Sequence, residues 1–118
     1  RSVDAATSAR DLRLIAAGNS FTFFDFWLSD QVGHRGSFED AENLVRDLDL
    51  FLAAVLEPAA DGVTVLVTSD HGNLEDKSVR THTRNMVPLL ASGPGAARFA
   101  GVNDLTGVAP AVRSILGL

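Results

Sequence analysis

The chain has 118 residues, of which 46% are hydrophobic, and a formal net charge of -5 at pH 7. This length allows one buried core and is too short for two ordinary domains. Lysine and arginine are scattered singly, which argues against nucleic acid as a partner. The longest apolar stretches, residues 21–28 and 62–67, are far shorter than the roughly 20 residues that span a bilayer, so we expect no membrane segment.

The amino end and the absence of cysteine narrow the class further. Charged residues near the start interrupt any signal-peptide core. Without cysteine the chain can form no disulfide and no thiolate site, so any metal must be held by histidine and carboxylate. We therefore expect a soluble, cytoplasmic protein. Because the chain begins at Arg1 rather than methionine, we also expect it to be part of a longer protein.

Three elements are predicted in the first half of the chain. Residues 3–17 carry apolar positions at helical spacing and are followed by Gly18 and Asn19, residues that commonly end a helix. Residues 20–28 read SFTFFDFWL, an aromatic run that predicts a strand covered on both faces. Residues 37–56 open with a capping pattern and repeat apolar side chains every three or four positions, which predicts a long helix.

The second half adds two short strands and a final helix. Residues 63–67 are a β-branched run, residues 87–91 are a third candidate strand, and a helix capped by Asp104 or Thr106 is predicted to run through Leu116. The order strand, helix, strand predicts a βαβ unit. We therefore expect a layered α/β/α structure with a mainly parallel sheet, in which ligands bind beyond the carboxyl ends of the strands.

All three histidines of the chain lie in loops next to predicted strands. Asp30 and His34 are four residues apart, so one helical turn would bring a carboxylate and an imidazole to one cation. His82 would complete a set of two histidines and one carboxylate. Asp70 and His71 are adjacent, so in an extended chain their side chains diverge. They would serve a second cation about 4 Å from the first, an arrangement suited to phosphoryl displacement.

Each motif taken alone has a simpler interpretation. A histidine beside an aspartate is commonly a solvated pair, and Gly33 and Gly72 are also typical turn residues. Arg84 has two interpretations, phosphate binding through its forked guanidinium or pairing with an acidic side chain, and both stay open.

Taken together, the motifs resemble the metalloenzyme domain of the alkaline phosphatase superfamily, which includes cofactor-independent phosphoglycerate mutases and phosphopentomutases. The resemblance rests on DQVGH at 30–34, TSDHGN at 68–73, and HT at 82–83 ahead of VP at 87–88, and it covers residues 20–118. The run DLTGVAP at 104–110 is similar to the family's last helix. The motifs are specific jointly, and SDHGNLED at 69–76 is closer to the mutase-like members.

The resemblance implies that Asp30, His34 and His82 bind one divalent metal ion and that Asp70 and His71 bind a second, with Mn or Zn as the ions. It also implies a phosphorylated small-molecule substrate. In this family a Ser or Thr nucleophile and one further Asp ligand come from an amino-terminal segment, and we find no match for either in this sequence. The nucleophile forms a phosphoenzyme while the metals neutralise developing charge.

We therefore expect residues 1–118 to form a single, partial, alkaline phosphatase-like domain, the second half of a phosphomutase or phosphatase that is inactive by itself. A sulfatase or another hydrolase of the superfamily would carry the same metal motifs, and so would a non-catalytic metal-binding or interaction module. Few helices remain to cover the apolar run 20–28. The chain is therefore expected to self-associate through an apolar face or an unpaired strand edge. The missing amino-terminal half of the domain is a further expected partner.

Overall fold

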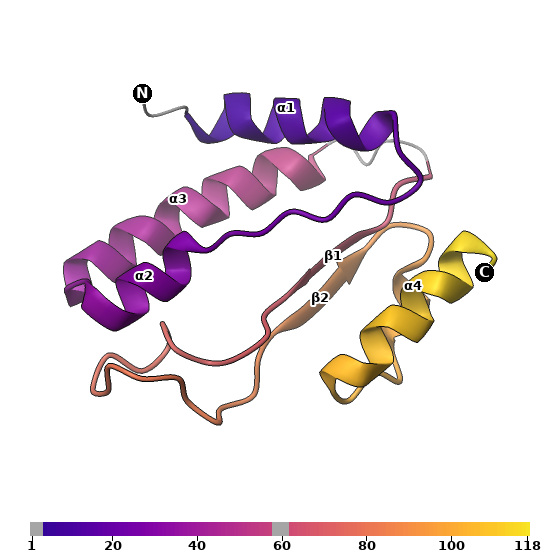
Figure 1. Cartoon of the computed structure of the whole chain (residues 1–118). Coiled ribbons are helices and arrows are strands. Elements are labelled where there is room, and N and C mark those ends of the chain that lie inside the picture. Colours follow the sequence, from indigo (N-terminus) through magenta and orange to yellow (C-terminus); the bar gives the residue numbers. More distant parts are fainter. Residues whose placement is uncertain (1–3, 58–61) are drawn as a thin grey trace. The chain divides into compact units, whose positions relative to one another are not determined.

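The computed structural model describes residues 4–57 and 62–118, which fall into two compact units. The first, named here the helical unit, comprises Arg1–Pro58 and His71–Met86. The second, the hairpin unit, comprises Ala59–Asp70 and Val87–Leu118. Figure 1 gives the elements in chain order. The expectation that residues 1–118 form one domain stays a prediction.

The helical unit contains three helices: α1 (Ala5–Ala17), α2 (Leu28–Arg35) and α3 (Phe38–Leu56). Asp4 caps α1 by accepting a hydrogen bond from the backbone of Thr7 at 3.0 Å. Ser37 and Asp40 form the capping box that starts α3. The predictions of helices at 3–17 and 37–56 are thus confirmed, although residue 3 lies outside the described residues.

Helices α1 and α3 pack along each other (Figure 1). The buried hydrophobic residues of this unit are Ala9, Ala41 and Phe51.

The predicted strand at residues 20–28 is wrong. Residues 20–26 run as irregular chain between α1 and α2, and α2 begins at Leu28 (Figure 1). A strand requires a neighbour for its backbone groups, and no strand among the described residues pairs with this segment. Phe24 packs on Phe51 of α3 with ring centroids 5.5 Å apart, whereas Phe23 is 80% exposed. Aromatic strand propensity misled here because it depends on the packing that a sheet supplies.

The hairpin unit contains five elements: β1 (Val65–Thr68), β2 (Leu89–Ser92), the 3-10 helices η1 (Ala96–Phe99) and η2 (Leu105–Gly107), and α4 (Val108–Leu116). Both strands overlap their predicted positions, but they pair antiparallel, with Val65 opposite Ser92. The mainly parallel, layered sheet is therefore not confirmed, because the one sheet in the described residues has two antiparallel strands. Parallel neighbours need a crossover, usually a helix, and residues 69–88 contain none.

The final helix forms and ends at Leu116 as predicted, but its predicted cap is not at its start: α4 follows Gly107 without a side-chain cap, and Asp104 caps the preceding 3-10 helix η2. Asp104 accepts a hydrogen bond from the Thr106 backbone at 2.8 Å, and α4 ends where Gly117 takes the left-handed conformation with φ 74°, the usual role of glycine there. Phe99 and Ala111 are buried within this unit. Among the described helices, none is long and apolar enough to cross a membrane.

Candidate metal centre

Helix α2 presents a carboxylate and an imidazole on one face. Asp30 lies in its first turn and His34 in its last, and Nε2 of His34 is 3.2 Å from Oδ1 of Asp30. The spacing of four residues produces this contact, because residues i and i+4 are neighbours on a helix. The Asp30 side chain is 44% exposed, so a cation can reach it from solvent.

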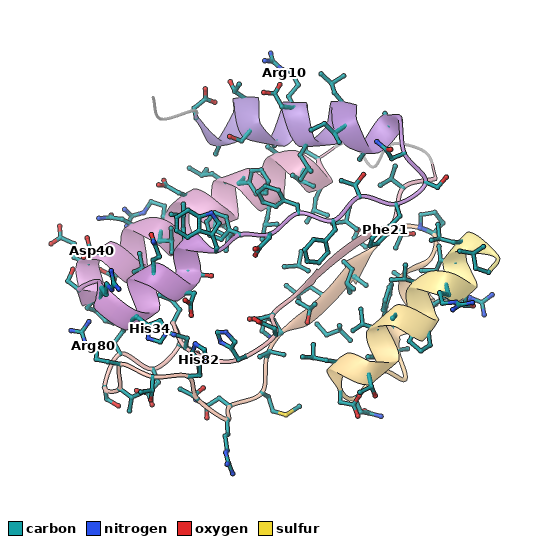
Figure 2. The ribbon with its side chains drawn as sticks, viewed as in Figure 1. Arg10, Phe21, His34, Asp40, Arg80 and His82 are labelled. Atoms are coloured by element: carbon teal, nitrogen blue, oxygen red, sulfur yellow. The ribbon has the colours of Figure 1, made fainter. Side chains whose placement is uncertain are left out.

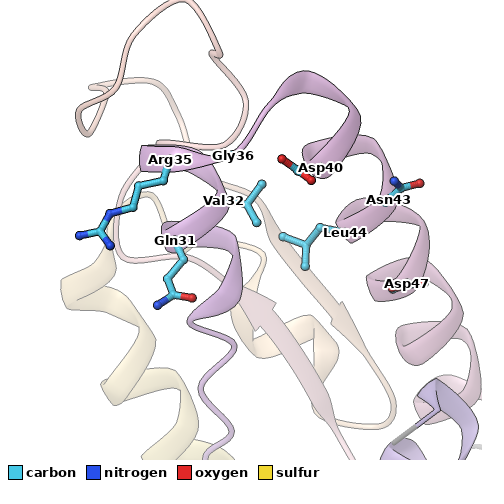
Figure 3. A pocket seen from close by; sticks show the side chains of 8 residues that line it. All are labelled: Gln31, Val32, Arg35, Gly36, Asp40, Asn43, Leu44 and Asp47. Atoms are coloured by element: carbon cyan, nitrogen blue, oxygen red, sulfur yellow. The ribbon is translucent and has the colours of Figure 1, made fainter. Parts of the chain in front are cut away.

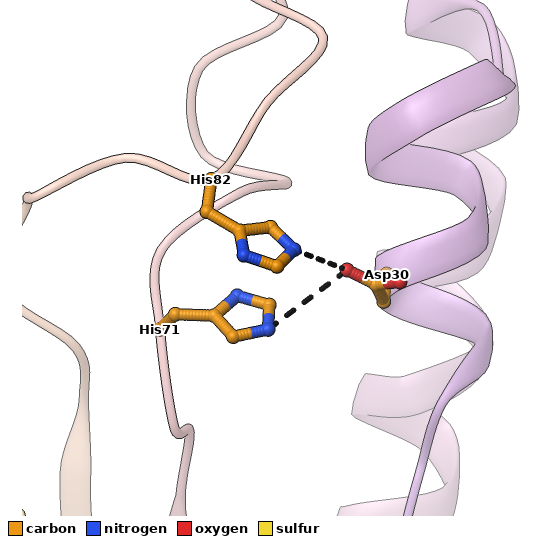
Figure 4. Close-up of side chains that lie close together, drawn as sticks. All are labelled: Asp30, His71 and His82. Carbon is orange, nitrogen blue, oxygen red and sulfur yellow. Dashed lines mark hydrogen bonds and ion pairs between the residues drawn. The ribbon is translucent and has the colours of Figure 1, made fainter.

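Residues 71–85, named here the histidine loop, bring two further imidazoles to Asp30. The Thr83 backbone N–H donates to the Gly72 carbonyl at 2.9 Å, which sets the two ends of the loop side by side. The rings of His71 and His82 therefore stack, with centroids 3.6 Å apart and planes 16° apart. Their Nε2 atoms lie 4.0 Å and 3.3 Å from Asp30 Oδ1, respectively (Figure 4).

The spacing of three donor atoms suits a single divalent ion. Oδ1 of Asp30, Nε2 of His34 and Nε2 of His82 lie pairwise 3.1, 3.2 and 3.3 Å apart. In a tetrahedral zinc site with bonds of about 2.0–2.1 Å, neighbouring donors are about 3.3 Å apart. Donor atoms of Asp30, His71 and His82 also lie within 4.8 Å of one another. The donor set therefore fits a metal, and nitrogen with carboxylate oxygen suits either zinc or manganese.

A backbone carbonyl orients His34 for this role. Nδ1 of His34 lies 2.7 Å from the carbonyl oxygen of Arg80. A carbonyl only accepts, so Nδ1 carries the proton and the Nε2 lone pair faces Asp30 and His82. Figure 2 shows His34 between the Arg80 segment and His82. Metal-binding histidines usually have such a partner, which fixes the tautomer and the ring direction.

Two cationic side chains fasten the histidine loop to the end of α2. The Lys77 ammonium donates to the carbonyl oxygens of Val32 and Gly33 at 2.7 and 3.0 Å. The Arg80 guanidinium donates to the Gly36 carbonyl at 2.9 Å. These carbonyls lie at the carboxyl end of the helix, where positive charge is favourable. The Val32 carbonyl also accepts from the Gly36 backbone N–H at 2.8 Å.

Asn73 is a buried polar residue that contacts the donor Asp30. It is 6% exposed, and its amide nitrogen donates to Oδ1 of Asp30 at 3.3 Å. Its side chain fits only because position 33 lacks one, since a Cβ on Gly33 would lie 1.5 Å from the Asn73 Oδ1. Gly33 is thus required by close packing and not by a turn.

We expect Gly33→Ala to destabilise the chain by about 1–3 kcal/mol, the usual cost of overpacking, despite alanine's better helix propensity. The new methyl group would force Asn73 away from Asp30. Urea unfolding monitored by circular dichroism measures the effect. Gly18→Ala is the matched control, because the nearest atom to a Cβ there is 3.7 Å away. A Gly33→Ala chain as stable as the Gly18→Ala chain would contradict the packing argument.

The structure does not test the predicted roles of two further site residues, Asp70 and Arg84. Asp70 directly precedes His71 and belongs to the hairpin unit, so its role as a ligand stays a prediction. Arg84 lies exposed in the histidine loop, and its role in substrate binding also stays a prediction. Sequence reasoning assigned no role to Asn73, Lys77 or Arg80. Of these three residues, Asn73 could have been identified, because it lies in the family-like run SDHGN at residues 69–73.

Two open hollows adjoin α2. The larger, about 540 Å³, is lined by Trp27, Asp30, Gln31, His34 and Arg35. The other, about 430 Å³, is lined by residues of α2 and α3, among them Arg35, Asp40 and Asp47 (Figure 3). The larger hollow is lined by two of the metal-fitting donors, Asp30 and His34.

Fold and site together define a candidate divalent-metal protein, and comparison with known proteins agrees. The family model described as Metalloenzyme superfamily matches residues 3–118. The chain therefore belongs to this superfamily. No solved structure shows a significant match.

The curated relatives include 2,3-bisphosphoglycerate-independent phosphoglycerate mutases from several bacteria. The protein of Wolinella succinogenes is 37% identical over 110 residues, covering 86% of this chain and 22% of the relative. The proteins of Desulforudis audaxviator and Thiobacillus denitrificans are 40% and 35% identical over 97 residues, covering 75% of this chain and 19% of each relative. The chain thus spans about a fifth of the length of the relatives it matches.

Proposed function

We propose that this chain is the metal-binding carboxyl-terminal part of a two-metal phosphoryl-transfer enzyme of the phosphoglycerate mutase type. The observation that carries the proposal is the convergence of the His34 and His82 imidazoles on Asp30 Oδ1. The relatives are phosphoglycerate mutases, and their activity supplies the proposed reaction class, an isomerase acting on a phosphorylated substrate.

In this proposal Asp30, His34 and His82 hold one divalent ion, Mn or Zn, while Asp70 and His71 contribute to a second. When bound, such ions neutralise charge on the phosphoryl oxygens. The residues of the chain contribute orientation: Arg80 holds the tautomer of His34. The open hollow beside Asp30 and His34 leaves room for a phosphorylated small molecule, with Arg84 as a proposed contact.

The nucleophile and the remaining metal ligand are proposed to come from an amino-terminal segment of the parent enzyme. That segment is also the proposed partner of the chain. A sulfatase or other hydrolase would use the same metal donors, so the substrate class is assigned from the relatives alone.

The proposal predicts metal binding without turnover. Calorimetric titration of the 118-residue chain with Zn²⁺ or Mn²⁺ should reveal binding, whereas hydrolysis of p-nitrophenyl phosphate should stay at the level of a blank. Mutase activity on phosphoglycerate should be equally absent, because the chain lacks a recognisable nucleophile. Adding the amino-terminal segment of a relative should restore turnover.

Either of two results would overturn this assignment. Turnover by the isolated chain, with contaminating phosphatase excluded, would show that the nucleophile lies within these 118 residues. A chain that binds neither ion would remove the metal-centre assignment altogether.

A further inference from the structure

Two of the candidate donors, His71 and His82, lie on a segment with almost no regular structure. Between residues 71 and 85 the only ladder contact is the isolated bridge between Gly72 and Thr83. A loop of this length would otherwise sample many conformations, and fixing it costs roughly 1–2 kcal/mol per residue. Side-chain contacts must therefore fix the positions of the two imidazoles.

The Glu75 carboxylate connects the two sides of the histidine loop. Its Oε1 accepts hydrogen bonds from the hydroxyl of Thr83 and from the Asn85 amide at 3.0 Å. Its Oε2 accepts from the Asn73 backbone N–H at 2.6 Å. Asn73 lies two residues after His71, and Thr83 directly follows His82. One carboxylate thus joins the backbone two residues after His71 to the side chain of the residue that follows His82.

The backbone of the histidine loop approaches this carboxylate closely at Gly72. A Cβ on Gly72 would lie 2.1 Å from the Thr83 hydroxyl oxygen and 2.5 Å from Glu75 Oε1. Glycine at this position therefore lets the Glu75 and Thr83 side chains meet against the backbone. The same hydrogen bonds, the one from Thr83 above all and then the one from Asn85, lower the pKa of Glu75 to about 2, although burial raises it.

A lowered pKa in the folded state means that the carboxylate stabilises the loop above its unfolded pKa of 4.5 and loses that effect as the pH falls toward about 2. Glu75 is consequently ionised throughout the range in which metal-binding histidines work. It lies outside the group of donors that could share an ion, and its oxygens are taken by Thr83, Asn85 and Asn73.

We propose that Glu75 is the positioning residue of the metal centre: by joining Asn73 to Thr83 and Asn85, it holds His71 and His82 stacked and directed at Asp30. The proposal rests on the proposed metal site, because positioning has a function only if these side chains bind an ion. Partners that orient ligands are typically worth about 10- to 100-fold in metal affinity.

The test compares three variants of the full chain by Zn²⁺ titration. Glu75→Ala removes all three hydrogen bonds and should weaken Zn²⁺ binding by about 10- to 100-fold. Glu75→Gln keeps a carbonyl for Thr83 and Asn85 but places an amide donor near the Asn73 N–H, so it should rescue part of the loss. Asp76→Asn is the matched control, because the neighbouring Asp76 carboxylate accepts from the backbone N–H and hydroxyl of Ser78. This variant should bind Zn²⁺ like the wild type.

Two further readouts separate positioning from general stabilisation. With Co²⁺ in place of Zn²⁺, the visible absorption spectrum reports coordination geometry, and it should change in Glu75→Ala but not in Asp76→Asn. In the metal-free chain, nuclear Overhauser contacts between the His71 and His82 rings should disappear in Glu75→Ala. The helix content measured by circular dichroism should stay that of the wild type.

The outcomes are distinguishable from those of the proposed function. If the wild type binds no metal but the ring contacts depend on Glu75, the metal centre fails and the positioning of the rings stands. If Glu75→Ala keeps both the wild-type Co²⁺ spectrum and the ring contacts, the positioning role is overturned. The positioning role is also overturned if the loss of Zn²⁺ affinity in Glu75→Ala is fully explained by the fraction of the variant that is unfolded.

Discussion

Asp30→Asn is expected to lower the Zn²⁺ affinity of the chain by about 100-fold or more, beyond what an outer partner usually contributes. Oδ1 of Asp30 lies 3.2 Å from His34 Nε2 and 3.3 Å from His82 Nε2, so it is the anionic centre of the donor set. Asparagine preserves shape and removes the charge. Calorimetric titration of both proteins measures the difference.

Asp25→Asn provides the matched control for this change. Asp25 is an exposed aspartate on the chain leading into α2, so its loss changes the net charge equally while leaving the donors intact. Within the same series, His34→Ala should weaken binding more than His71→Ala, because the Nε2 of His71 is farther from Asp30, at 4.0 Å. Equal affinity of the Asp30→Asn and Asp25→Asn chains would show that the ion binds elsewhere.

Features set by local sequence were predictable. The capping box of Ser37 and Asp40 and the apolar repeat behind it define α3, since capping and periodicity act within a few residues. The contact between Asp30 and His34 follows in the same way from their spacing on α2. The approach of His82 to this pair joins residues 52 positions apart. It was expected from the placement of all three histidines in loops and from the resemblance to a known family, and not from any local contact.

Features that depend on distant partners were not predictable from residue patterns. The aromatic run at residues 20–28 carries strand propensity, yet a strand forms only where another strand accepts its backbone hydrogen bonds. The role of Glu75 was hidden for a similar reason. Its three partners are Asn73, Thr83 and Asn85, and they meet only after the histidine loop has closed.

Self-association of the isolated chain is expected to depend on the aromatic segment before α2. Phe21, Phe23, Phe24 and Trp27 are 56%, 80%, 52% and 57% exposed, respectively. Burying a large apolar side chain contributes roughly 1.5–3 kcal/mol, so contact between two copies through this segment is favourable. The backbone of residues 20–26 also offers hydrogen-bonding groups that no described strand pairs.

The double variant Phe23→Ser, Trp27→Ser should therefore raise the dissociation constant of the dimer by about 100-fold, corresponding to about 2.8 kcal/mol. Sedimentation velocity over a range of concentrations measures it. Leu14→Ser is the control, because Leu14 is 68% exposed on α1 but lies outside the aromatic segment. If the wild type sediments as a monomer at every concentration, the exposed rings do not drive association, and the chain behaves as a compact module that needs no second copy.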